Sequence, residues 1–78
     1  MDTLDAGPIN TAAAAIPSLD EEALEEFIAA LDLLKEHKQY AAADAYHEGD
    51  VELSERLAAA ANAAIGALAA ARAELQER

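Results

Sequence analysis

Side chains suited to binding a cation gather in the twelve-residue stretch DAYHEGDVELSE. Carboxylates stand at Asp44, Glu48, Asp50 and Glu55, with Gly49 in their midst. Hard cations such as Ca²⁺ prefer oxygen ligands, and a glycine permits the sharp turn that brings such ligands together. These residues are therefore the candidate calcium ligands of this sequence.

The stretch resembles the calcium loop of EF-hand proteins. Asp44 stands at position 1 of that loop, Gly49 at 6, Val51 at 8 and Glu55 at 12. The resemblance implies a single calcium-binding helix-loop-helix. Tyr46 departs from it, because it stands at position 3, where the loop needs an oxygen ligand. The alternative is a short helical turn around Gly49 with solvated acids, and we expect that turn rather than a metal site.

The two histidines are a second source of metal ligands. His37 and His47 fall on one expected helix, about 15 Å apart in rise, so they cannot share an ion within one chain. Together with Glu36 and Asp44 they could contribute to a site between subunits. The alternative is that all four are polar surface residues near a helix end.

No arrangement of residues indicates catalysis. The chain has no cysteine, and Ser18 and Ser54 fall near helix starts, where capping accounts for them. Carboxylates are abundant, but nothing in the sequence buries a pair of them for acid–base chemistry. The three glycines lie too far apart to form a phosphate loop. We expect a protein that is not an enzyme and that uses no cofactor.

Composition and charge limit the partners. Alanine supplies 23 of the 78 residues, whereas Leu, Ile, Val and Phe together supply 16, so a single core is thin. The net charge is −11, and residues 1–34 carry eight acids but no Lys or Arg. Such a chain repels nucleic-acid phosphates and anionic membranes. We expect a protein partner instead, either further copies of the chain or a basic surface.

No segment indicates export or a membrane span. The N-terminus is acidic, whereas a signal peptide begins with basic residues. The longest uncharged run in the second half, from Leu57 to Ala71, is shorter than the roughly 20 residues that a bilayer requires. The expected location is the cytoplasm or a virion.

Two long helices and one turn make up most of the chain. Ser18 and Glu21 form a capping box at the start of the first helix. Gly49 suits the left-handed position after a helix, and Asp50 suits the cap of the next one. Matched lengths and a short turn predict an all-α, antiparallel, coiled-coil-like hairpin. The predicted segments are an N-terminal arm at 1–17 and a hairpin at 18–78, with helices at 18–46 and 51–77 and a turn at 47–50.

The arm is expected to be extended and to lie on a neighbouring subunit. Gly7 and Pro8 signal a turn, and Pro17 ends the short TAAAAI run, which has room for one or two helical turns.

Apolar residues recur at spacings of three and four along both helices, which predicts a seam between them. The predicted seam residues are Leu24, Phe27, Ile28, Leu31 and Leu34 on the first helix and Leu57, Ala61, Ala64, Leu68 and Leu75 on the second.

The opposite face of the second helix is also uncharged. Ala59, Ala63, Gly66, Ala70 and Ala73 follow the same spacing, where a solvent face would carry Lys, Glu and Arg. Small residues permit close approach of a second helix. We expect this face to contact another subunit. The competing interpretation is that alanine is simply a good helix former and faces water.

The first helix has two further candidates for intersubunit contact. Leu33 and Tyr40 lie opposite its seam. The alternative is that they are scattered apolar surface residues, which are common.

Two resemblances to known families involve the bend. AYHEGD is similar to the bend of secreted WXG-type helical hairpins, although the Trp-x-Gly motif is absent. That resemblance implies pairing with a second, different hairpin chain. KQYAAADAYHEGDVEL resembles the first helices of bacteriophage portal proteins, which place a Tyr and a Gly before a bend. From the residues themselves, we expect an assembly subunit within an oligomeric helical bundle, of a kind that suits a phage or bacterial structure.

Overall fold

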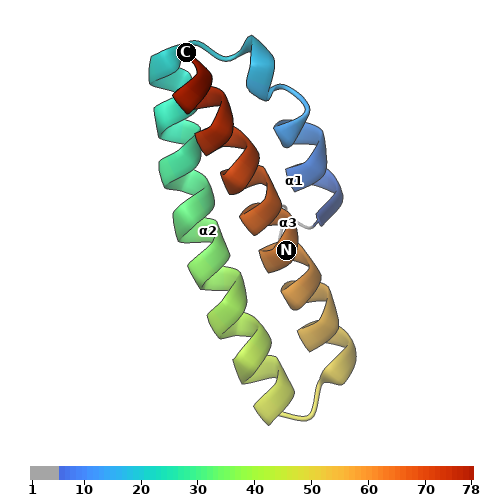
Figure 1. Cartoon of the computed structure of the whole chain (residues 1–78). Coiled ribbons are helices and arrows are strands. Elements are labelled where there is room, and N and C mark those ends of the chain that lie inside the picture. Colours follow the sequence, from blue (N-terminus) through green and yellow to red (C-terminus); the bar gives the residue numbers. More distant parts are fainter. Residues whose placement is uncertain (1–5) are drawn as a thin grey trace.

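The computed structural model describes residues 6–78, and every element in it is a helix (Figure 1). The elements are α1 (Ala6–Ala13), the short 3₁₀ helix η1 (Ile16–Ser18), α2 (Glu21–His47) and α3 (Val51–Glu77). Helices α2 and α3 pack side by side along their length, which confirms the all-α hairpin. The molecule is a rod of 45 × 18 × 17 Å.

The turn between α2 and α3 forms as the sequence predicts. Gly49 has φ of +86°, the left-handed conformation that favours glycine. The amide of Asp50 donates to the carbonyl of Ala45 at 2.9 Å, and that of Gly49 donates to Tyr46 at 3.0 Å. This is the Schellman pattern that ends a helix. The Asp50 carboxylate then accepts from the Leu53 amide at 3.1 Å and caps α3.

The start of α2 differs from the prediction. The N-cap is Asp20, whose carboxylate accepts a hydrogen bond from the Ala23 amide at 2.8 Å. Ser18 belongs instead to η1, and Leu19 is extended. Pro17 favours a tight turn at this point, so the long helix begins three residues after the predicted start.

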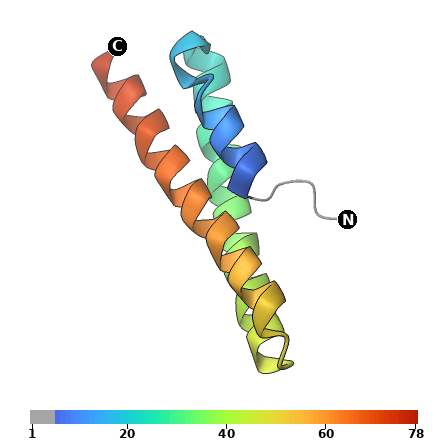
Figure 2. The same ribbon diagram turned by 90° about the vertical axis from the view of Figure 1, so that its right-hand side faces the viewer.

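Residues 1–5 of the predicted arm lie outside the described residues, and residues 6–17 are not extended as the sequence led us to expect. Residues 6–13 form α1, which packs against α3 of the same chain, beside its C-terminal half (Figures 1 and 2). Ile9 and Ile16 are buried, and Ala13 packs beside them. Spacings of four and three give this segment an apolar face, and alanine favours the helix. Gly7 and Pro8 lie within the first turn of α1, where a proline is tolerated.

The core lies where three helices meet and is rich in alanine. Ile9 packs with Leu31 of α2 and with Ala64 and Leu68 of α3, and a second cluster joins Ile16 to Leu24 and Ala71. Beyond the start of α1, towards the turn, the hairpin continues as two helices only (Figure 2). No helix among residues 6–78 has the length and hydropathy needed to cross a bilayer.

Candidate interaction surface

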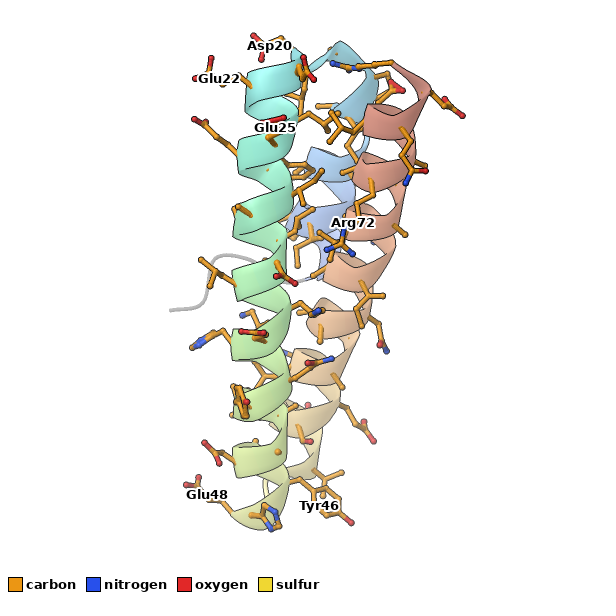
Figure 3. All side chains as sticks on the ribbon, turned by 60° about the vertical axis from the view of Figure 1, so that its left-hand side comes forward. Asp20, Glu22, Glu25, Tyr46, Glu48 and Arg72 are labelled. Carbon is orange, nitrogen blue, oxygen red and sulfur yellow. The ribbon has the colours of Figure 1, made fainter. Side chains whose placement is uncertain are left out.

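The two long sides of the molecule differ in charge. Six of the fifteen exposed residues of α2 are acidic and none is Lys or Arg. Figure 3 shows Asp20, Glu22 and Glu25 at one end of the helix and Glu48 just beyond the other. The exposed surface of α3 carries no charged residue between Arg56 and Arg72. Residues 6–19, which include α1 and η1, are also without charge. Residues 6–19 and the exposed residues of α3 between positions 57 and 71 therefore form an uncharged surface, which we call the α1–α3 face.

Most of the residues predicted to contact another subunit lie on the α1–α3 face. Ala59, Gly66, Ala70 and Ala73 are exposed. Ala63 is half-buried because it packs against the core around Ile9. Its position on the flank nearest α1 explains the difference from the other four.

Gly66 has open space around it within this chain. A Cβ built on Gly66 has no atom within 4 Å outside its own helix. No close approach inside the chain therefore requires a glycine at this position. The missing side chain leaves a shallow site in the middle of the exposed face of α3.

A groove crosses the α1–α3 face. Its walls are Ala13, Ile16 and Pro17 on one side and Ala70 and Ala73 of α3 on the other, and its volume is about 380 Å³. Glu74 and Glu77 line the end of the groove that is nearer the C-terminus of α3. The groove is thus apolar along its walls and acidic at one end.

The two predicted contact residues on α2 lie outside the α1–α3 face. Leu33 is 70% exposed and Tyr40 is 73% exposed. Tyr46, Val51 and Leu53 are exposed nearer the turn, where α1 does not reach. These side chains are separate from the groove.

The predicted seam residues lie between the helices, at different depths. Leu24, Leu31, Ala61, Ala64 and Leu68 are buried. The others are half-buried, and they are Phe27, Ile28, Leu34, Leu57 and Leu75. Ala60 and Ala67 are also buried although the seam did not include them, because α1 covers a second side of α3.

The twelve-residue stretch considered as an alternative calcium loop does not form a single loop. Asp44 lies within α2 and Glu55 within α3, so only Glu48, Gly49 and Asp50 separate the helices. The Asp50 carboxylate caps α3. Continuous helices hold these acids at fixed separations instead of folding them around an ion.

No group of three or more metal-ligating side chains converges among residues 6–78. Glu36, His37, Asp44 and His47 are exposed on α2.

Two polar residues have roles that the sequence interpretation missed. Lys38 is buried, and desolvation lowers the pKa of its amine below the ordinary value. Leu24, Leu31, Lys38 and Ala45 follow one another at intervals of seven, so the spacing contained the signal. The Ser54 hydroxyl donates to the Ala42 carbonyl at 2.9 Å and links α3 to α2.

Comparisons with known proteins returned no match, whether with models of protein families, with curated protein sequences or with solved structures.

Proposed function

We propose that this protein is a non-catalytic assembly subunit that packs through its α1–α3 face into a homo-oligomer or a larger complex. One observation carries the proposal: the exposed surface of α3 is uncharged from residue 57 to residue 71, a run of about 22 Å at 1.5 Å per residue. A contiguous uncharged surface on so acidic a chain is typical of a contact between proteins.

The charge distribution supports an oriented contact. The net charge is −11, and the exposed side of α2 carries much of it. Two copies that met through their acidic sides would repel one another, whereas the α1–α3 faces approach without that cost. The acidic sides then remain in water and keep the assembly soluble.

The thin core gives a second reason for assembly. Among residues 6–78, six of the eleven buried hydrophobic residues are alanines, which bury little area each. Small domains with so little core gain stability by burying further surface against a partner. An assembly of this composition suits a component of a bacterial or phage structure.

The experiment is a substitution at the centre of the face. Gly66→Leu adds a large side chain at an exposed position of α3, where a Cβ meets no atom of the same chain within 4 Å outside its own helix. We expect the mass measured by light scattering to fall to that of a single chain, with the dissociation constant raised about ten- to a hundredfold by overpacking. Helicity measured by circular dichroism should stay unchanged.

Ala43→Leu is the matched control. Ala43 is exposed on α2, on the side opposite its packed face, so the same kind of added side chain should leave the mass unchanged. A wild-type protein that remains a single chain at high concentration would contradict the proposal, as would a Gly66→Leu variant of unchanged mass.

A further inference from the structure

The groove on the α1–α3 face has an end that suits a basic side chain. Its apolar walls come from α1, η1 and α3, and Glu74 and Glu77 line one end. Glu77 is exposed, and Glu74 is half-buried and already lies 3.8 Å from the Arg78 guanidinium. An arginine fits such a site because its stem is apolar and its head is a cation. This inference rests on the proposed self-assembly and asks which side chain of a second copy occupies the groove.

The chain itself supplies a suitable arginine at the other end of α3. Arg56 is exposed and lies 18 residues before Glu74, which is five full helical turns. Arg56 and Glu74 therefore lie on the same flank of α3. Arg72 is 16 residues from Arg56, which places it almost on the opposite flank. Of these two arginines, only Arg56 shares the flank that borders the groove.

Antiparallel pairing of two α3 helices brings the arginine to the groove. If two copies are related by a twofold axis at Gly66, Ala59 of one faces Ala73 of the other, since each is seven residues from the axis. Arg56 lies ten residues before Gly66, and the two carboxylates lie eight and eleven residues after it. The axial offsets are then within about 3 Å, which an arginine side chain spans.

The opposite orientation is unfavourable. A parallel, in-register pair would place Glu77 opposite Glu77 and keep Arg56 21 residues, about 32 Å, away along the axis. In the antiparallel pair Glu77 faces Glu55 of the other copy, but Arg56 lies beside that Glu55, so only this orientation brings a cation to the carboxylates. We infer that two copies of this chain pair antiparallel through α3, with Arg56 of each copy lying in the other's groove against Glu74 and Glu77.

The size of the face is consistent with such a pair. A stable interface buries about 800 Å² per partner. The rod measures 45 Å by 18 Å, so one whole long side projects an area of similar size. Contact along α3 alone is too narrow, and the groove walls on α1 and η1 are needed to complete it.

Disulfide trapping tests the orientation. The chain has no cysteine, so Ala59→Cys and Ala73→Cys each introduce one exposed thiol. A disulfide requires Cα atoms within about 4.4–6.8 Å. We expect no cross-linked dimer from either variant alone under mild oxidation, and a cross-linked dimer when the two variants are mixed. Cross-linking within each single variant, without preference for the mixture, would overturn the inference.

Charge reversal tests the arginine. Arg56→Glu should raise the dimer dissociation constant about tenfold, because each pair contains the contact twice. Arg72→Glu is the control, since it changes the net charge by the same amount from the other flank. Adding Glu77→Arg to Arg56→Glu should restore association. Equal effects of Arg56→Glu and Arg72→Glu, or no restoration, would refute this role of Arg56.

These results are distinguishable from failure of the proposed function. Suppose that Gly66→Leu dissociates the dimer but that each single-cysteine variant cross-links with itself. The assembly proposal would then stand, and the antiparallel pairing would be wrong. A wild-type chain that stays single at every concentration removes both.

Discussion

At the scale of single residues, the turn depends on one backbone conformation. Among residues 6–78, only Gly49 has a positive φ, and the Schellman hydrogen bonds around it join α2 to α3. A side chain at this φ clashes with the backbone. We expect Gly49→Ala to lower the free energy of unfolding by about 1 kcal/mol, measured by urea denaturation.

Gly7→Ala is the matched control for that variant. Gly7 lies in α1 without a positive φ, and a Cβ built there meets no atom within 4 Å. Alanine is the better helix former, so this substitution should leave stability equal or slightly raised. If both variants lost the same free energy of unfolding, the left-handed conformation of Gly49 would not be the cause of the loss.

At the scale of elements, one isoleucine each holds α1 and η1 to the hairpin. Ile9 and Ile16 are 2% and 3% exposed, and each belongs to a different core cluster. We expect Ile9→Ala and Ile16→Ala each to cost about 2–4 kcal/mol in the free energy of unfolding, because each removes buried methyl groups and leaves a cavity. Thermal denaturation followed by circular dichroism measures the loss.

Ala15→Gln provides the comparison at an exposed position between α1 and η1. Its effect should stay within about 0.5 kcal/mol. If the isoleucine variants were as stable as this control, α1 would not be docked as the structure shows. Because α1 forms one wall of the groove, the same variants are also expected to weaken association.

At the scale of the whole molecule, unbalanced negative charge opposes folding. The net charge of −11 is spread over a rod only 18 Å across, so many like charges lie within the Debye length of low-salt buffer. Raising sodium chloride from about 0.02 M to 0.2 M should stabilise the dilute single chain by about 1 kcal/mol, through screening of this repulsion. The shift in melting temperature measures it.

A variant carrying Glu36→Gln and Asp44→Asn tests the cause of that shift. Both residues are exposed on α2, and both changes reduce the net negative charge. The salt response should be smaller in this variant than in the wild type. A salt response of the same size would point to preferential exclusion of salt rather than to charge screening.

Local chemistry made parts of the fold predictable from the sequence. The Gly49–Asp50 turn follows from backbone conformation and capping, both of which act within a few residues. The Glu74–Arg78 pair, 3.8 Å apart, is local in the same sense, because residues four apart are neighbours on one helix face. The buried face of α3 follows from spacing, because helical geometry fixes which residues share a side.

Contacts between segments distant along the chain required the tertiary structure. The sequence of residues 6–18 permits both an extended arm and a docked helix, and the apolar surface of the hairpin selects the helix by burying Ile9 and Ile16. The burial of Lys38 is decided in the same way, since a seven-residue spacing marks a face but does not show what covers it. The sequence by itself determined the two long helices, their turn and the uncharged face of α3, because those depend on neighbours along the chain. Only the tertiary structure decided that α1 completes that face and borders a groove, because that depends on which surfaces are left to bury.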